Sequence, residues 1–269
     1  MSLTNSTHVG IDGDIILYRV GFACQHTDYS VYIEGDEAEG RLASFPNKTE
    51  LNKWLKENEG EYTITDYTYT EDLANALHSA KLMIQNILEK TGAATYTIYL
   101  TGTNNFRNSV LPSYKAGRAA RPLLYADIKS YIINEYHTIL SDGVEADDAL
   151  GIAQCKDPIH HVIATIDKDL LMIPGRHYNF VKDTWHETSE TEGSYFFDCQ
   201  LLTGDTVDNI CGIKGLGPKT AEKLLKDKTP TERREIICEQ YLKYWGEDFM
   251  EVLECNEQLL WILREPRET

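Results

Sequence analysis

The pattern of hydrophobic and polar positions predicts short strands that alternate with longer helices. Apolar residues recur at helical spacing in residues 73–90, whereas residues 161–166 form a nearly continuous apolar run typical of a strand buried on both faces. We therefore expect an α/β fold with a mostly parallel central sheet flanked by helices. The full pattern predicts helices at residues 47–58, 73–90, 126–140 and 146–154, strands at residues 9–11, 62–70, 96–100, 161–166 and 177–181, and a β-hairpin from residues 29–33 and 41–45 around a turn at residues 35–40.

The pattern changes after Glu192, where strand signals stop and helical spacing continues. A glycine-rich turn at residues 212–217 interrupts this helical region. We expect an α/β core at residues 1–190 and a small helical module at residues 191–269.

The composition of the 269-residue chain is that of an ordinary globular protein, with 42% hydrophobic residues. No apolar run reaches the roughly 20 residues that a membrane span needs, and residues 1–10 lack the pattern of a signal peptide. We therefore expect a cytoplasmic protein that does not bind membranes. The six cysteines are scattered without a Cys-x-x-Cys pair, so a bound metal would be held by oxygen ligands.

The net charge of −17 argues, taken alone, against a nucleic-acid partner, because phosphate contacts depend on Lys and Arg. The charges are unevenly distributed, however. Residues 101–122 contain no acid, whereas residues 28–39 contain no Lys or Arg. A basic strip for phosphate contact can therefore coexist with an acidic surface that keeps DNA away from other faces. The basic residues of this strip are Arg107, Lys115, Arg118 and Arg121.

Acidic residues gather where the predicted strands end. Ligands of open α/β sheets bind outside the carboxyl ends of the strands, so these acids can converge on one site. The acids are Asp12 after the first strand, Glu145, Asp147 and Asp148 at the start of a helix, Asp167 and Asp169 after the apolar strand, and Asp205 and Asp208, which are spaced by one helical turn.

Such a cluster is costly without cations. Two unit charges about 4 Å apart repel by about 4 kcal/mol at an effective dielectric constant of about 20. The cluster therefore either holds protons or binds hard divalent cations such as Mg²⁺ or Mn²⁺, and two such ions can activate water at a phosphodiester. A single acid of this kind is more often a helix cap or a turn residue, as Asp147 or Asp205 could be. Four acidic clusters, two of them beside strand ends, favour the metal site.

The motifs, taken in order, resemble the flap-endonuclease and 5′→3′ exonuclease family, above all its phage and bacterial-polymerase branch. The resemblance covers residues 96–225 and the first strand, and it depends on the order and spacing of motifs that are weak individually. The motifs are Ile11-Asp12-Gly13, Tyr114-Lys115-Ala116-Gly117-Arg118, Glu145-Ala146-Asp147-Asp148, Asp167-Lys168-Asp169, Gly204-Asp205 to Asn209, and Gly212 to Ala221.

The resemblance implies a PIN-like core, a helical arch at about residues 101–140 and a helix–three-turn–helix module that grips duplex DNA. It implies that the eight acids hold two Mg²⁺ or Mn²⁺ ions, that Lys115 and Arg118 steer the scissile phosphate, and that Tyr114 stacks on a base. Glycine backbone and basic side chains of the module would contact duplex phosphates, around a K⁺ ion held by residues 212–221. These DNA-contacting residues are Gly212, Lys214, Gly215, Gly217, Lys219 and Thr220, to which Arg107 and Arg121 add charge.

The activity that the resemblance implies is metal-dependent hydrolysis of phosphodiester bonds at 5′ flaps, 5′ ends or RNA–DNA hybrids during replication or recombination. We expect a monomer that acts beside replication proteins in the cytoplasm, which is the host cytoplasm if a phage encodes the chain. Lys115 and Arg118 could instead be a solvated helix face, and the glycines an ordinary turn.

The sequence departs from the family in two places. The strand at residues 96–100 is followed by Thr101 and Gly102, where the family commonly has a metal-binding Asp; Asp14 would replace it if the first strand continued. The segment at residues 24–70 has no match and is either an acidic insertion or a partner-binding element. Two rival functions stay open: a junction-binding protein of the same fold without activity, and a single-strand ribonuclease, against which residues 212–221 argue.

Overall fold

The computed structural model describes residues 6–33 and 40–267 of the chain. Internal contacts divide the chain into two compact units. Unit 1 comprises Met1–Ile15, Ile84–Ala120 and Tyr136–Thr269, and unit 2 comprises Ile16–Met83 and Arg121–Glu135. None of the described helices combines the length and the apolar character that a membrane span requires.

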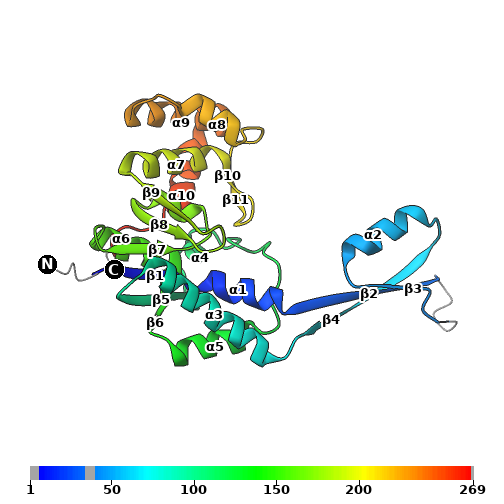
Figure 1. Ribbon diagram of the computed structural model, residues 1–269. Coiled ribbons are helices and arrows are strands. Elements are labelled where there is room, and N and C mark those ends of the chain that lie inside the picture. Colours follow the sequence, from blue (N-terminus) through cyan, green and yellow to red (C-terminus); the bar gives the residue numbers. More distant parts are fainter. Residues whose placement is uncertain (1–5, 34–39, 268–269) are drawn as a thin grey trace. The chain divides into compact units, whose positions relative to one another are not determined.

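Unit 1 is built on a six-stranded sheet that is mostly parallel (Figure 1). The edge strand β9 pairs antiparallel with β8, and every other neighbouring pair is parallel. The predicted α/β fold with a mostly parallel sheet is therefore confirmed. In spatial order the strands are β6 (Thr138–Ser141), β5 (Thr95–Thr101), β1 (His8–Asp12), β7 (His161–Ala164), β8 (Gly175–Asn179) and β9 (Thr184–Thr188).

The central strands of this sheet are buried, which explains their continuous apolar sequences. Val9 and Ile11 of β1 have no exposed surface, and all four residues of β7 are buried. Helix α6 (Ala146–Lys156) packs against β1, β5 and β7. The sequence pattern of 161–166 thus arises from burial on both faces of a parallel sheet.

Unit 2 contains most of two long helices and all of a third. The three helices are α1 (Gly13–Ala23), α3 (Leu73–Thr91) and α5 (Tyr125–Glu135). Within this unit α1 packs closely against the segment that leads into α5, because a Cβ atom on Gly21 would lie 2.5 Å from the ring of Pro122. The rings of Tyr18 and Tyr125 meet edge to face, with centroids 5.4 Å apart.

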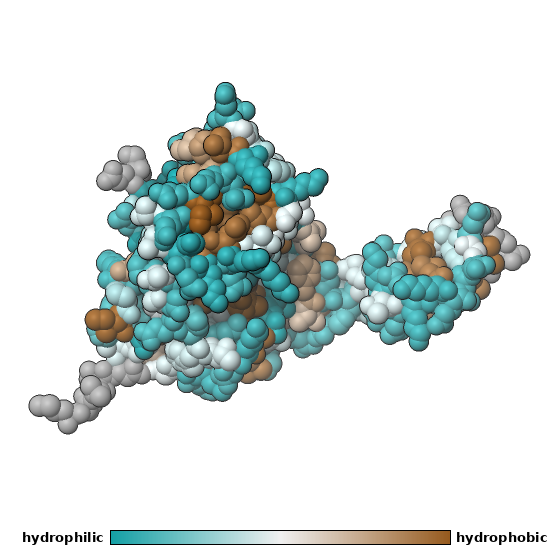
Figure 2. All heavy atoms as spheres, turned by 90° about the horizontal axis from the view of Figure 1, so that it is seen from above, coloured by the Kyte–Doolittle hydropathy of each residue, from teal (hydrophilic) through white to brown (hydrophobic). Residues whose placement is uncertain are grey.

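The segment at residues 24–70 forms a small α/β element of unit 2. Strands β2 (Gln25–Ile33) and β4 (Tyr62–Thr70) pair antiparallel along their whole length, and β3 (Ala43–Phe45) pairs with the other edge of β2. Helix α2 (Lys48–Glu57) places Trp54 between Phe45 of β3 and Tyr62 of β4. Figure 2 shows hydrophobic atoms among hydrophilic ones on the surface of this element. The predicted hairpin pairing is confirmed, while residues 35–39 of its predicted turn lie outside the described residues.

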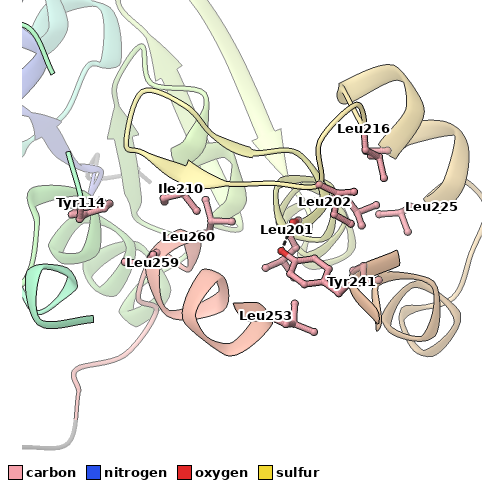
Figure 3. Packing of buried hydrophobic residues seen from close by; sticks show 13 residues of the cluster. Tyr114, Leu201, Leu202, Ile210, Leu216, Leu225, Tyr241, Leu253, Leu259 and Leu260 are labelled. Atoms are coloured by element: carbon pink, nitrogen blue, oxygen red, sulfur yellow. Dashed lines mark hydrogen bonds between the residues drawn. The ribbon is translucent and has the colours of Figure 1, made fainter. Parts of the chain in front are cut away.

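The C-terminal part of unit 1 is a group of helices with a compact core (Figure 3). Side chains of the four helices meet in one cluster with residues of the loop before α8, including Leu201, Leu216 and Leu253. The Tyr241 hydroxyl lies inside this cluster and donates to the Leu201 carbonyl at 2.6 Å. The helices are α7 (Glu190–Thr203), α8 (Pro218–Leu225), α9 (Pro230–Trp245) and α10 (Phe249–Leu260), with the two-residue strands β10 (Gly204–Asp205) and β11 (Ile210–Cys211) between α7 and α8.

Two expectations about secondary structure were wrong. The helix predicted at residues 126–140 ends at Glu135, because Thr138–Ser141 pairs in parallel with β5 as the edge strand β6. The region after Glu192 is not purely helical, because β10 and β11 form a short antiparallel ladder. The first difference comes from pairing with a distant strand, and the second from a local ladder between residues 204–205 and 210–211, neither of which helical spacing reveals. The predicted arch segment contains the four-residue helix α4 (Arg107–Val110), turns and α5, and its arching remains a prediction.

We expect Tyr241→Phe to lower the free energy of unfolding by about 1–3 kcal/mol, because it leaves the buried Leu201 carbonyl without its donor. The amide of Asn256, which donates to the same hydroxyl at 2.9 Å, would lose one acceptor as well. Urea denaturation of the variant beside Tyr244→Phe, whose ring is 47% exposed, measures the effect. Equal losses in both variants would contradict a specific role of the buried hydroxyl.

Candidate metal centre

The sheet brings several of the predicted acids to one edge. Asp12 is the last residue of β1, and Asp167 follows the end of the neighbouring strand β7. Glu145 is the N-cap residue of α6, the helix that follows β6, and Asp147 lies in its first turn. Because the carboxyl ends of parallel strands meet at one edge, these acids converge as the sequence predicts.

Asp12, Asp147 and Asp167 repel one another electrostatically. Burial, followed by the charges of Asp14 and Asp167, raises the pKa of Asp12 to about 7, although the Thr165 hydroxyl donates to its Oδ2 at 2.7 Å. Burial and the charge of Asp12, with further contributions from Asp167 and Glu145, raise the pKa of Asp147 well above its usual range. Shifts of this kind arise where carboxylates are buried, and they grow where further carboxylates lie nearby without enough positive charge.

Asp169 links this group to the turn at residues 206–209. Burial, followed by the charges of Asp167 and Asp205, raises the pKa of Asp169 to about 7. The Gln200 amide of α7 donates to Asp169 Oδ1 at 2.8 Å. Asp205 ends β10, and its Oδ1 accepts from the Val207 amide at 2.8 Å. Asp205 and Asp208 therefore flank a turn between two short strands, and the helical spacing expected for them was wrong.

The acids do not form a closed ligand set in this conformation. Among the residues that the structure describes, no three His, Cys, Asp or Glu side chains are arranged to hold one ion. The donor chemistry nevertheless fits a hard divalent cation, since the clustered donors are carboxylate oxygens with raised pKa values. Added positive charge would remove the repulsion that these shifts report.

Basic side chains of residues 113–118, which we call the basic turn, occupy two of the acids instead. The Lys115 ammonium pairs with Glu145 Oε1 and lies 3.8 Å from Asp208 Oδ2. Arg118 donates from Nε to Asp208 Oδ1 at 2.9 Å. Lys115 has a φ of +59°, and its amide donates to the Asp208 carbonyl at 3.0 Å. A helix face, one expectation for Lys115 and Arg118, is therefore absent, because the chain turns sharply to reach Asp208.

Tyr114 differs from the sequence expectation. Its side chain is only 6% exposed and belongs to the apolar cluster that also contains Ile210, Leu259 and Leu260 (Figure 3). Its hydroxyl donates to Glu145 Oε2 at 3.0 Å, and burial, followed by the charge of Glu145, raises its pKa so that it stays protonated. The ring therefore offers no open face for a base in this conformation, because the apolar cluster covers it.

Arg107 and Asp148 were assigned wrongly from sequence. Arg107 was expected to contact DNA and Asp148 to bind metal, yet both are buried, with 2% and 0% exposure. The guanidinium makes two hydrogen bonds with the Asp148 carboxylate, at 2.6 and 2.9 Å. A buried charge requires such a partner, and the pair leaves Arg107 no surface for phosphate.

Two further expectations concern Asp14 and Arg121. The first strand does not continue to Asp14, because α1 begins at Gly13. Asp14 nevertheless accepts from the Thr101 amide at 3.2 Å, at the end of the acid-free strand β5, and its charge acts on Asp12. Arg121 belongs to unit 2, where its guanidinium lies over the Tyr125 ring at 4.7 Å.

The glycine-rich segment lies between β11 and α8. It lines a pocket of about 700 Å³ together with Tyr244 and Trp245 of α9. Gly215 has a φ of +84°, which favours glycine, and Gly212 has no room for a Cβ atom, which would lie 2.1 Å from the Thr203 carbonyl. The side chains of Lys214, Lys219 and Thr220 are exposed.

Thr165 and Gln200 are site residues that sequence reasoning missed. Their contacts with Asp12 and Asp169 fix the orientation of two acids. Thr165 is a polar residue near the end of the apolar run and directly follows β7, which is a signal that could have been used, whereas Gln200 lies within a helix and carries none.

Without divalent cations, Asp169→Asn should reduce the pH dependence of stability by the share that Asp169 contributes. The folded chain holds a proton on Asp169 up to about pH 7, whereas the unfolded chain releases it near the usual value of 3.8. The free energy of unfolding therefore falls as the pH rises through this window, by on the order of 1 kcal/mol or more. Urea unfolding in EDTA at about pH 5 and about pH 8 measures this slope. The exposed control Asp66→Asn should keep the slope of the parent chain, and an unchanged slope in Asp169→Asn would contradict the prediction.

Sequence comparisons find named relatives, although no family model matches the chain. The chain is 32% identical over 177 residues to a 5′-3′ exonuclease of Buchnera aphidicola, covering 58% of this chain and 61% of the relative. It is 28% identical over 152 residues to a 5′-3′ exonuclease of Bacillus subtilis, covering 49% and 51%. It is also 30% identical over 165 residues to DNA polymerase I of Thermus thermophilus, covering 55% of this chain and 20% of that protein. The matches thus span about half to three fifths of the two exonucleases.

Structure comparisons find the same fold in phage proteins. The T5 D15 protein, co-crystallised with metal ions, matches 94% of this chain and 89% of its own with a TM-score of 0.60 at 16% identity. A variant of the bacteriophage T5 flap endonuclease, solved with DNA and metal ions as a pseudo-enzyme–product complex, matches 68% and 80% with a TM-score of 0.54 at 17% identity. The resemblance and the fold class expected from the sequence are confirmed: the chain is related in sequence to 5′-3′ exonucleases and shares the fold of the T5 enzymes.

Proposed function

We propose that the chain is a metal-dependent 5′ nuclease that hydrolyses phosphodiester bonds at 5′ flaps, 5′ ends or RNA–DNA hybrids. The observation that supports this most directly is the group of acids at the carboxyl edge of the sheet, in which Asp12, Asp147 and Asp169 raise their pKa values through burial and mutual repulsion. Carboxylate oxygens without basic side chains to neutralise them are suitable ligands for Mg²⁺ or Mn²⁺. Relatives named 5′-3′ exonuclease support the reaction class.

The residues proposed to hold two ions come from four segments of unit 1. The ions, when bound, would supply charge stabilisation and a more acidic water for in-line attack that leaves a 5′-phosphate. Asp148 is excluded from this set because Arg107 occupies its carboxylate. The proposed ligands are Asp12, Glu145, Asp147, Asp167, Asp169, Asp205 and Asp208.

Lys115 and Arg118 are proposed to bind and orient the scissile phosphate. Both now pair with acids of the proposed metal site, Lys115 with Glu145 and Arg118 with Asp208. Cations that neutralise these acids would weaken both pairs, so the two basic side chains become free to contact a phosphate and stabilise its developing charge. Until then the Tyr114 hydroxyl, 3.0 Å from Glu145 Oε2 and 3.2 Å from Asp208 Oδ2, donates its single proton to one of these carboxylates at a time.

The glycine-rich segment is proposed to bind duplex DNA. Backbone without side chains at Gly215 and Gly217 permits close approach of a phosphate, and no atom lies within 4 Å of a Cβ placed at either position. Lys214 and Lys219 add positive charge to an otherwise acidic chain. A K⁺ ion at residues 212–221 belongs to the same proposal.

We further propose a monomer that acts in the cytoplasm, or in the host cytoplasm if a phage encodes it, alongside replication proteins. The similarity to DNA polymerase I supports the connection with replication. A junction-binding protein without activity is the second candidate, because β5 ends at Thr101 without an acid.

Asp147→Asn should abolish metal-dependent cleavage, with a loss of more than about 100-fold, because it removes a proposed ligand rather than an outer contact. A 5′-labelled flap duplex incubated in Mg²⁺, in Mn²⁺ and in EDTA measures this. Asp66→Asn, a change in exposed strand β4, serves as the matched control and should cleave like the parent chain. Tight flap binding by the parent chain without cleavage in either metal would establish the junction-binding candidate.

Lys115→Met should bind Mn²⁺ more tightly than the parent chain while it cleaves more slowly. The lysine competes with the cation for Glu145, so its removal favours the ion, but the phosphate loses a positive contact. Calorimetric titration with Mn²⁺ alone and a comparison of kcat with KM separate the two effects. We expect kcat to fall by about 100-fold. Unchanged or weaker Mn²⁺ affinity would show that the lysine does not compete for the site.

A further inference from the structure

Three distant parts of unit 1 meet at the Arg107 guanidinium. Its Nη1 and Nη2 donate to the Asp148 carboxylate in the first turn of α6. Its Nε donates to the Leu259 carbonyl at 2.8 Å, and Nη2 donates to the Trp261 carbonyl at 2.7 Å. One side chain of the short helix α4 therefore joins the start of α6 to the end of α10 and the segment after it.

The Asp148 carboxylate is saturated with donors. Oδ1 accepts from Arg107 Nη2 at 2.9 Å and from the Leu263 amide at 3.1 Å. Oδ2 accepts from Arg107 Nη1 at 2.6 Å and from the Glu145 amide at 3.0 Å. A carboxylate offers about four lone-pair sites. All of them are used, and the side chain has no exposed surface, so Asp148 has no oxygen left for a metal ion or a water molecule.

The contacts of Asp148 reach the proposed metal site through the backbone. Asp148 holds the amide of Glu145, the N-cap residue, and Glu145 and Asp147 are both acids of that site. The Arg107 guanidinium also lies 3.7 Å from Glu145 Oε2. The basic turn begins at Ser113, three residues after the end of α4, and it places Lys115 against Glu145. A displacement at Arg107 would therefore move acids and phosphate-binding residues together.

We propose that Arg107 and Asp148 are positioning residues, which use the C-terminal segment 259–263 as a brace to hold the first turn of α6 where Glu145 and Asp147 can bind metal. This inference rests on the proposed nuclease function. In this inference Asp148 supports the metal ligands rather than binding metal itself, and metal binding depends on segment 259–263.

The geometry of the brace requires arginine. A guanidinium serves the carboxylate and two carbonyls at once through a planar fork, which a lysine ammonium does not reproduce. Contacts of this kind around metal ligands are worth about 10–100-fold in metal affinity when they are removed. The test is therefore the affinity for Mn²⁺ alone, measured by calorimetry, in Arg107→Met, Arg107→Lys and Asp148→Asn.

The brace and a ligand role for Asp148 predict opposite signs for Arg107→Met. If Asp148 were a ligand, loss of Arg107 would free its charge for the ion, and Mn²⁺ would bind more tightly. If the two residues position α6, Arg107→Met and Asp148→Asn should each weaken Mn²⁺ binding by about 10–100-fold, with little further loss in the double variant. Arg107→Lys should not restore the affinity. Tighter Mn²⁺ binding by Arg107→Met, or full affinity in Arg107→Lys, would overturn the inference.

A second buried pair provides a control for loss of stability. Arg233 of α9 is 3% exposed, and it donates to Asp198 Oδ2 at 2.5 Å and to the Lys228 carbonyl at 3.1 Å. Arg233→Met therefore removes the same chemistry from the C-terminal helices. At a temperature well below its unfolding transition this variant should retain the Mn²⁺ affinity of the parent chain. An equal loss of affinity in Arg233→Met would reduce the Arg107 effect to general destabilisation and overturn the positioning role.

A measurement on the parent chain covers the case in which the variants do not fold. Amide hydrogen exchange at Leu263 and Glu145 should remain slow when Mn²⁺ binds, because Asp148 keeps both amides as donors. Faster exchange at both amides on Mn²⁺ binding would mean that Asp148 turns to the ion, which contradicts the brace. If the parent chain neither binds Mn²⁺ nor cleaves a flap, the proposed function itself fails; if it does both and the variants match it, only the brace fails.

Discussion

Repulsion between carboxylates is the constraint on which the arrangement of this protein depends. The parallel sheet delivers Asp12 and Asp167 to one edge, and α6 adds Asp147, so burial and mutual charge raise the pKa of Asp12 and Asp147. The chain cannot relieve this repulsion by moving Asp12 and Asp167 apart, because they stand at or just after the ends of buried strands whose positions are fixed by packing. Positive charge must come from basic side chains or bound cations, and the structure shows which basic side chains pair with acids of this region.

Basic residues meet this demand in two physically different ways. Lys115 and Arg118 pair with Glu145 and Asp208 from a turn whose side chains remain 24% and 41% exposed, so these pairs can separate at modest cost. The Arg107 pair with Asp148 is fully buried, and breaking it would leave an uncompensated charge in the interior. The same acidic region therefore contains pairs suited to exchange with a ligand, at Glu145 and Asp208, and a pair suited to permanence, at Asp148.

The segment at 24–70 is stabilised separately from the six-stranded sheet of unit 1. It forms its own antiparallel strands and is held by Trp54 between Phe45 and Tyr62, with none of the proposed site acids in it. Helix α2 contacts β3 and, through Trp54, Tyr62 at the start of β4. Asp12, Asp147 and Asp167 belong instead to unit 1.

The sequence by itself determined the parallel sheet, most element positions and the gathering of acids at strand ends, because burial on both faces and the ends of strands leave local patterns. It did not reveal that Asp148 and Arg107 form a buried ion pair with each other. Arg107 meets Asp148 and the Trp261 carbonyl only after folding. Nor did it show that Tyr114 is buried in the apolar cluster of the C-terminal helices. Tertiary structure decided the roles of Asp147 and Asp148, which are of identical type and adjacent in α6. Asp147 lies near the acids Asp12 and Asp167, whereas Asp148 pairs with Arg107.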